Sequence, residues 1–265
     1  MSDNIVDTSK PSAGRIYDYL LGGSHHYEVD RLAAEQIIAA APHVRKLARL
    51  QRWALRDIAM ELSQNRGFDV IIDFASGLPT VDHIHTNVPE GTTVIYSDFD
   101  PVVVEFGQRL LADIPNVHYF ENDASRPEEL LGRPDVQKIL GGRRKVAIGY
   151  WGFNSFLNDE ELAHSTRALY DWAAPGSCLA YNAQAVVNET SPAMLESIEI
   201  YKKMGAPFYI RSLEKHRELS QPWKLDEQGF IPLLDWHGFD ESEMGKEDKA
   251  NFGPFGGGYG AYLIK

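Results

Sequence analysis

Short apolar runs alternate with amphipathic segments over residues 69–204, and this alternation is the feature that most constrains the fold. We expect strands at the apolar runs and helices between them. Right-handed crossovers of this kind place parallel strands in one sheet with helices on both faces. The sequence therefore predicts an α/β protein with a doubly wound, mostly parallel sheet. The expected strands are DVIIDF (69–74), TTVIYS (92–97), NVHYF (116–120), KVAIGYW (145–151) and SCLAYN (177–182).

Helices are expected before, within and after this alternation, and the chain ends in strand-like segments. We expect one domain over residues 1–265, with a helical cap at 1–66 and a core at 67–265. The expected helices cover residues 30–41, 43–63, about 158–172 and 191–204, with two more beginning at Pro79 and Pro101. Beyond Gly205, FIPLLDW (230–236) and GYGAYLIK (258–265) are strand-like, and FGPFGGGYG (252–260) is typical of a turn into an antiparallel closing strand.

The charge and cysteine content narrow the function classes. The chain has 26 basic and 38 acidic residues, a net charge of −12, which argues against nucleic acid as a partner. The single cysteine, Cys178, excludes an internal disulfide framework and fits a reducing compartment. No apolar stretch approaches the roughly 20 residues that span a bilayer, and no signal peptide is visible. We expect a cytoplasmic protein without a membrane partner; the sequence leaves its oligomeric state open.

Ligands of open parallel sheets bind beyond the carboxyl ends of the strands, so the residues that follow each strand matter most. The segment DFASGLPT (73–80) keeps one glycine of the three in the dinucleotide fingerprint, and Pro79 removes an N–H that a pyrophosphate would use. The carboxylate of Asp73 would repel a pyrophosphate and attract an ammonium or sulfonium group. This loop favours S-adenosylmethionine over NAD.

Two further acids follow the next two expected strands. Asp98 lies where a carboxylate reaches ribose hydroxyls, and Phe99 after it can lie against an adenine ring. Asp123 ends the third strand, where an acceptor can bind the adenine amino group. Each acid taken alone has an alternative, because aspartate commonly caps the helix after a strand.

The order of these acids resembles the cofactor side of the Rossmann-like S-adenosylmethionine-dependent methyltransferases. More narrowly, the chain is similar to the S-adenosyl methyltransferase family abundant in actinomycetes, formerly a domain of unknown function. The segments that carry this resemblance are PSAGRIYDYLLGG (11–23), VDRLAAEQI (29–37), DFASGLPT, YSDFDPVVV (96–104) and GFIPLLDW (229–236). The chain departs from the family at Ala75, where a glycine is usual, and at Ser155, where a histidine is frequent.

The resemblance implies that S-adenosylmethionine is the cofactor and that residues 11–27 cover it as a lid. Within this lid we expect Arg15 to pair with Asp18 on one helix face and Tyr17 to face the pocket; the alternative is that the tyrosines only pack the segment onto the core. The expected cofactor-binding residues are Asp73, Ala75, Ser76, Gly77, Asp98, Phe99, Asn122, Asp123, Ala124, Arg15, Tyr17, Gly22 and Gly23.

Methyl transfer needs alignment in a dry pocket more than it needs a dedicated base. The candidates for proton transfer are Tyr17, His25 and His26. Aromatic residues after the fourth strand suit a flat or apolar acceptor, although core packing explains them equally well. The acceptor-binding candidates are Tyr27, Tyr150, Trp151, Phe153 and Asn154.

Two other patterns, one of histidines and one of arginines, have an ordinary structural explanation. Asp82, His83 and His85 face different ways on the expected helix, so no metal site is predicted. Arg45, Arg49, Arg52 and Arg56 form a basic stripe that is typical of a solvated helix face; the alternative is a contact surface for an acidic substrate or partner.

The predicted function is methyl transfer from S-adenosylmethionine to a small-molecule acceptor. The alternatives are an NAD(P)-dependent oxidoreductase on a similar sheet and a non-catalytic protein that binds S-adenosylmethionine or S-adenosylhomocysteine. Fold alone does not separate these three functions.

Overall fold

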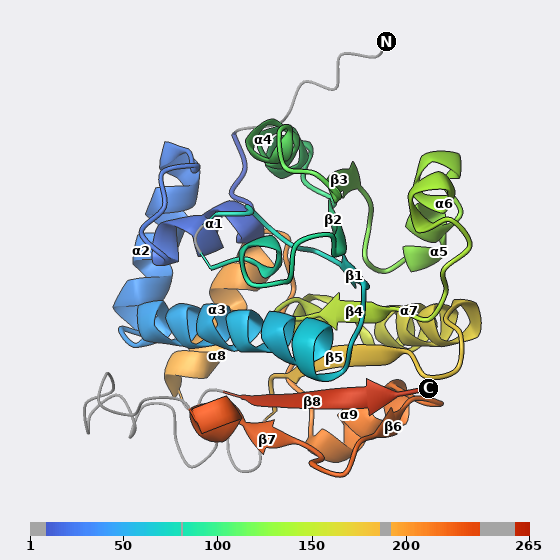
Figure 1. The fold of residues 1–265 in the computed structure, drawn as a ribbon. Helices are drawn as coiled ribbons and strands as arrows, with labels where there is room; N and C mark the ends of the chain where they lie inside the picture. Colours follow the sequence, from blue (N-terminus) through green and yellow to red (C-terminus); the bar gives the residue numbers. More distant parts are fainter. Residues whose placement is uncertain (1–8, 81, 186–191, 239–257) are drawn as a thin grey trace.

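The structure, a computed structural model, describes residues 9–80, 82–185, 192–238 and 258–265. Its sheet has the strand order β3-β2-β1-β4-β5-β8-β6, and β7 pairs with β8 (Figure 1). The parallel strands are β1 (Val70–Asp73), β2 (Thr93–Asp98), β3 (Val117–Glu121), β4 (Ala147–Tyr150) and β5 (Cys178–Ala183). Three strands near the carboxyl end complete it: β8 (Tyr259–Ile264) is antiparallel to β5, and β6 (Lys224–Leu225) and β7 (Ile231–Pro232) are antiparallel to β8. The predicted mostly parallel sheet with an antiparallel closing strand is confirmed.

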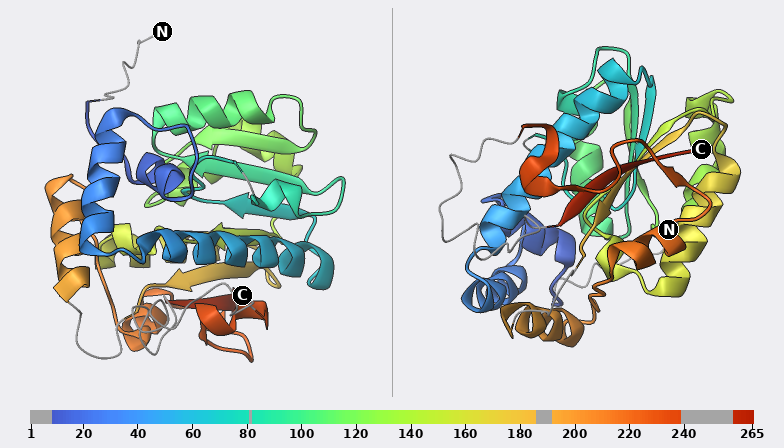
Figure 2. Two further views of the ribbon diagram at one scale, coloured as in Figure 1. Left: turned by 90° about the vertical axis from the view of Figure 1, so that its left-hand side faces the viewer. Right: turned by 90° about the horizontal axis from the view of Figure 1, so that it is seen from below.

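Helices cover both faces of the sheet, which explains why the central strands are apolar on both sides. One face packs against α3 (Val44–Met60) and α4 (Pro101–Leu111). The other packs against α5 (Pro127–Leu131), α6 (Pro134–Leu140), α7 (Asp159–Trp172) and α9 (Leu213–Leu219). The right-hand view of Figure 2 shows the sheet on edge between these layers. Every residue of β1, β2, β4 and β5 is buried.

A third apolar cluster joins the amino-terminal helices. It contains α1 (Ala13–Leu20), α2 (Glu28–Ala40) and the beginning of α3, with residues of α8 (Pro192–Lys203) packed against it. Figure 2, left, shows α2 and α8 side by side at one end of the molecule, although they are far apart in the sequence. The expected helical cap thus has its own packed interior.

Local capping chemistry explains where several helices begin. The Oδ1 atom of Asp100 accepts a hydrogen bond from the backbone N–H of Val102 at 2.9 Å, and Pro101 occupies the first turn of α4. Asn158 and Glu161 form a reciprocal capping box at the start of α7. None of the helices in the described part of the chain has the length and apolar character needed to cross a bilayer.

The expected helix at Pro79 is wrong. Residues 74–80 and 82–83 are irregular, and a short 3-10 turn follows at Ile84–Thr86. The carbonyl oxygen of Ser76 is bound by the His83 ring at 3.1 Å, and Asp82 has a left-handed φ of +58°, so the backbone cannot continue as a helix there.

The carboxyl-terminal segments follow the predictions only in part. FIPLLDW was expected to be a strand, but it pairs only at β7 and then forms a 3-10 turn at Leu233–Gly238. GYGAYLIK contains β8 as expected. Residue 191 of the expected helix 191–204, and residues 252–257 of the expected glycine-rich turn, lie outside the described residues.

Candidate functional site

The strand order reverses at β1, which lies between β2 and β4, and Asp73 ends this strand. Its carboxyl group lies over Gly149 of β4, because a Cβ atom built on Gly149 would be 2.1 Å from Asp73 Oδ1. Only a glycine at position 149 leaves room for this carboxyl group. Crevices at such a switch point are the usual ligand sites of open α/β sheets.

The Asp73 carboxyl group is 3% exposed, and burial raises its pKa to about 7. A hydrogen bond from Ser76 and the positive charge of Arg52 oppose this rise in pKa, and the charge of Asp98 adds to it. The site therefore holds a carboxyl group with too little positive charge around it. A bound cation would stabilise the ionised form.

The loop after β1 crosses the end of β2 in a strained conformation. Ala75 has a φ of +49° and Gly77 a φ of +63°, both in the left-handed region. The N–H of Ser76 donates to the carbonyl oxygen of Ser97 at 2.8 Å, and the N–H of Gly77 donates to Asp98 Oδ2 at 2.9 Å. These bonds fix the loop against the strand end that carries Asp98.

Asp98 is 5% exposed and is held by backbone donors. Its Oδ1 atom accepts from the N–H of Asp100 at 3.0 Å, in addition to the bond from Gly77. Burial raises the pKa of this carboxyl group to about 6, against the hydrogen bonds that favour its ionised form. Each carboxylate oxygen has two lone pairs, so both oxygens retain capacity for a further donor such as a ribose hydroxyl.

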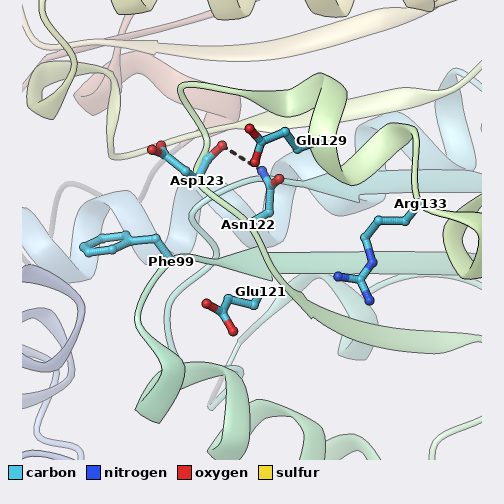
Figure 3. Close-up of a pocket in the computed structure, with 6 residues that line it drawn as sticks. All are labelled: Phe99, Glu121, Asn122, Asp123, Glu129 and Arg133. Carbon is cyan, nitrogen blue, oxygen red and sulfur yellow. Dashed lines mark hydrogen bonds between the residues drawn. The ribbon is translucent and has the colours of Figure 1, made fainter. Parts of the chain in front are cut away.

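A cavity of about 450 Å³ lies at the ends of β2 and β3 (Figure 3). It brings together three residues that were predicted to hold the adenosine: Phe99, Asn122 and Asp123. Phe99 is 64% exposed, which is unusual for a phenylalanine and leaves much of its surface available to a ligand. Asn122 Nδ2 donates to the backbone oxygen of Asp123 at 2.8 Å, and Ala124 lies in the core beneath them.

Three charged residues that the sequence reasoning missed complete the lining of this cavity, namely Glu121, Glu129 and Arg133. Glu121 is the last residue of β3, so its place at a strand end was a usable signal. Arg133 stacks over the Phe120 ring at 5.1 Å from the loop between α5 and α6, which no spacing rule connects to this site.

The expected pair between Arg15 and Asp18 is wrong. Arg15 instead donates from Nε to Asp30 Oδ2 at 2.8 Å and from Nη1 to Asp100 Oδ2 at 2.6 Å. Asp18 Oδ2 accepts from the N–H of His25 at 2.8 Å and contacts His26 Nδ1 at 3.2 Å. Long-range partners displace the local pair because both groups are buried, and buried charges need complete hydrogen bonding.

The remaining lid residues are fixed by packing. The hydroxyl of Tyr17 donates to the carbonyl oxygen of Ala48 in α3 at 2.9 Å, so the ring lies against α3 and burial raises its pKa. Gly22 has a φ of +83°, and a Cβ atom on Gly23 would lie 2.0 Å from Asp18 Oδ1. The two glycines thus serve a left-handed turn and a close approach, respectively. His25 packs edge-on against Phe106.

None of the five acceptor-binding candidates lines this cavity. Tyr150 points to the face of the sheet that α7 covers. Its hydroxyl bonds Ser165 of α7, and the centre of its ring lies 4.4 Å from that of Phe153. Trp151 packs on Trp236 in the α3 layer, and Asn154 donates to the backbone oxygen of Asn182. Tyr27 remains 39% exposed at the start of α2. Four of the five candidates are thus buried, and Tyr27 is the exposed one.

The described residues contain no cluster of histidine, cysteine and acidic side chains that could hold a metal ion. His83 is fully buried, and both of its ring nitrogens have partners: Nδ1 accepts from the N–H of Ile84 at 3.0 Å and Nε2 donates to Ser76. Burial lowers the pKa of His83 well below its usual value.

Solved structures resemble this chain over nearly its whole length. A proposed methyltransferase from Thermobifida fusca YX is 28% identical, with a TM-score of 0.86, and the match covers 98% of this chain and 97% of that one. A DUF574 family protein from Streptomyces avermitilis MA-4680 is 26% identical, with a TM-score of 0.86 and coverages of 98% and 99%. The mitomycin 7-O-methyltransferase MmcR shares the fold at 12% identity and a TM-score of 0.55, over 83% of this chain and 56% of that one.

Comparison with curated proteins gives no match. The sequence model described as S-adenosyl methyltransferase, in contrast, matches residues 1–259. Together with the acidic strand ends and the parallel sheet, this match shows that the chain belongs to the S-adenosyl methyltransferase family.

Proposed function

We propose that this methyltransferase acts on a small-molecule acceptor and holds S-adenosylmethionine across the ends of β1, β2 and β3. S-adenosylmethionine supplies an electrophilic methyl group on a sulfonium. In this proposal Asp73 binds the methionyl ammonium group, Asp98 accepts from the ribose hydroxyls, and Phe99, Asn122 and Asp123 hold the adenine. The observation that carries the proposal is that the buried acids Asp73 and Asp98 end two neighbouring strands, and that the exposed Phe99, next to Asp98, lines a cavity at the ends of β2 and β3.

The residues of the proposed site fit S-adenosylmethionine better than a dinucleotide. Asp73 and Asp98 are acceptors when ionised, which suits an ammonium group and hydroxyls and would repel a pyrophosphate. The loop after β1 forms no helix over residues 74–80, so it presents no helix N-terminus to phosphate groups. These two features support the methyltransferase over an NAD-dependent oxidoreductase.

A small molecule is proposed as acceptor because the chain's net charge of −12 opposes the approach of a nucleic acid. The amino-terminal helices α1 and α2 form a cap that Arg15 ties to the start of α4, next to the cofactor residues. Such a cap can exclude water around reacting groups. For a hydroxyl acceptor, His25 and His26 are the candidate bases within the cap.

The cofactor arrangement is tested by calorimetric titration of Asp98→Asn with S-adenosylhomocysteine. One acceptor oxygen is lost and the charge removed, so we expect affinity to fall roughly 10-fold or more. Asp69→Asn is the matched control, since it makes the same change at an exposed acid that precedes β1 and is not assigned to the cofactor. Equal affinities of Asp98→Asn and wild type would contradict the ribose assignment.

The acceptor class is tested by measuring S-adenosylhomocysteine release. A cell extract is separated into low-molecular-weight, protein and nucleic acid fractions, and each is supplied with S-adenosylmethionine and enzyme. Release with the low-molecular-weight fraction alone is expected. Release only with the protein or nucleic acid fraction would overturn the small-molecule proposal. Binding without release in any fraction would favour the non-catalytic alternative.

A further inference from the structure

One arginine of the α3 stripe differs from the other three. Arg45 and Arg56 are at the surface, where they pair with Glu35 and Asp57, and Arg49 is exposed. Arg52 is only 7% exposed. The expected solvated stripe is therefore correct for three members and wrong for the fourth, which lies on the buried face of α3.

The Arg52 guanidinium lacks an anionic partner. Its Nε and Nη1 atoms are buried without a hydrogen-bond acceptor, and it forms no salt bridge with any carboxylate of the described residues. Burying a charge without partners costs several kcal/mol, and buried guanidinium groups in folded proteins are normally bound on all sides. An arginine left in this state points to an anion that binds from outside the chain.

Tyr17 holds this guanidinium in place. The Arg52 Cζ atom lies 5.4 Å from the centroid of the Tyr17 ring. The hydroxyl of that ring bonds the carbonyl oxygen of Ala48, one turn earlier on α3. The guanidinium therefore stacks on a ring that is itself anchored to the same helix. This contact fixes the position of the guanidinium group.

The groups around Arg52 identify the ligand chemistry. Burial raises the pKa of Asp73 and lowers that of His83, and the positive charge of Arg52 opposes the first shift and adds to the second. His83 cannot supply a hydrogen-bond acceptor for Arg52, because both of its ring nitrogens already have partners. Asp73 is close enough to interact electrostatically and yet forms no salt bridge with Arg52. A cation and a carboxyl group that interact electrostatically without forming a salt bridge are complementary to the carboxylate and ammonium groups of an α-amino acid.

We propose that Arg52 binds the methionyl carboxylate of S-adenosylmethionine while Asp73 binds the ammonium group of the same moiety. This inference rests on the proposed function and adds a binding residue outside the strand ends. It also gives Tyr17, the first tyrosine of the RIYDYLLGG segment, a role: the ring positions Arg52 from the cap.

Calorimetry with three ligands separates this role from a general effect on the pocket. S-adenosylhomocysteine carries the whole amino acid, its decarboxylated analogue lacks only the carboxylate, and 5′-methylthioadenosine lacks both charged groups. Arg52→Gln should weaken S-adenosylhomocysteine binding by roughly 10- to 100-fold, the range expected for charge-assisted hydrogen bonds. Its affinity for the other two ligands should equal that of wild type. Arg52→Lys keeps the positive charge but loses the planar pair of N–H donors, so its affinity for S-adenosylhomocysteine should lie between those of wild type and Arg52→Gln.

Arg49→Gln is the matched control, because it makes the same change one turn away at an exposed site and should leave all three affinities unchanged. Binding of 5′-methylthioadenosine by Arg52→Gln also reports an intact fold. If Arg52→Gln does not fold, the same three titrations are made with Arg52→Lys. A loss of affinity confined to S-adenosylhomocysteine then supports the proposal. A loss of equal size for all three ligands, or none for any, would overturn it. If wild type binds none of the three ligands, the proposed function itself fails, which distinguishes the two failures.

Discussion

The guanidinium of Arg15 in α1 donates to the carboxylate of Asp100, the residue that caps α4, over a sequence separation of 85 residues. The same guanidinium binds Asp30 in α2. Asp100 is two residues beyond Asp98, the candidate ribose ligand, and its N–H donates to that side chain. One arginine thus fixes the amino-terminal cap to the loop that carries the candidate cofactor residues.

Replacement of Arg15 with Gln should strongly destabilise the fold. The substitution leaves the Asp30 and Asp100 carboxylates buried without their cation, and breaking a buried pair on one side costs about 3–5 kcal/mol. Urea denaturation of the purified variant measures this loss. Arg109→Gln removes an exposed pair with Glu105 and should change the free energy of unfolding little; equal losses in both variants would contradict the account.

Glycine positions 14 and 23 should respond oppositely to alanine. A Cβ atom at position 23 would lie 2.0 Å from Asp18 Oδ1, so Gly23→Ala must displace a carboxylate that binds His25, at a cost of about 1–3 kcal/mol. At position 14, in α1, a Cβ atom would meet Val103 at an ordinary 3.7 Å. Gly14→Ala should therefore stabilise the protein by up to about 1 kcal/mol. Thermal melts of both variants provide the comparison.

Ala75→Gly should raise stability. Ala75 has a φ of +49°, where a Cβ atom is disfavoured by about 1 kcal/mol and a glycine is not. The gain should be several tenths of a kcal/mol, because glycine also gains freedom in the unfolded chain. Ala112→Gly, at a right-handed and exposed position after α4, is the control and should lose stability. A loss at both positions would show that the loop after β1 is not strained.

The sheet was predictable because periodicity and burial are local signals. Each of the five expected parallel strands is present to within a residue or two at its ends, since β1 and its neighbours are apolar on both faces. The absence of a helix at Pro79 was not predictable. The contact between His83 and Ser76 and the left-handed φ of Asp82 exclude a helix there, and no periodicity encodes either feature.

The candidate site divides in the same way. Asp73, Asp98 and Phe99 follow strands, and strand ends can be read from the sequence. Arg52 looks like a surface residue in its stripe, and only the packing of α1 and α3 buries it. Arg15 and Asp18 have the spacing of a helical pair, but partners far along the chain outcompete it. Tertiary competition of this kind lies outside any local rule.

Stability should fall as pH rises between about 4 and 7 through Asp73. Burial raises the pKa of this group to about 7 in the folded protein, against about 3.9 when unfolded. In that window the folded state holds a proton that the unfolded state has released, so the free energy of unfolding falls with pH, by at most about 1.4 kcal/mol per unit. Asp73→Asn should flatten this slope in urea denaturation at pH 5, 6 and 7. Asp69→Asn, at an exposed carboxylate, should retain it.

Calorimetric titration of the wild-type protein with S-adenosylhomocysteine and with NAD⁺ tests the central claim most directly, which is that the carboxyl ends of β1, β2 and β3 hold the adenosyl cofactor. We predict saturable binding of S-adenosylhomocysteine at one site per chain and no heat with NAD⁺. At about 100 times the dissociation constant, the ligand should add roughly 2.7 kcal/mol to the free energy of unfolding. Saturable binding of NAD⁺ without binding of S-adenosylhomocysteine would contradict the account.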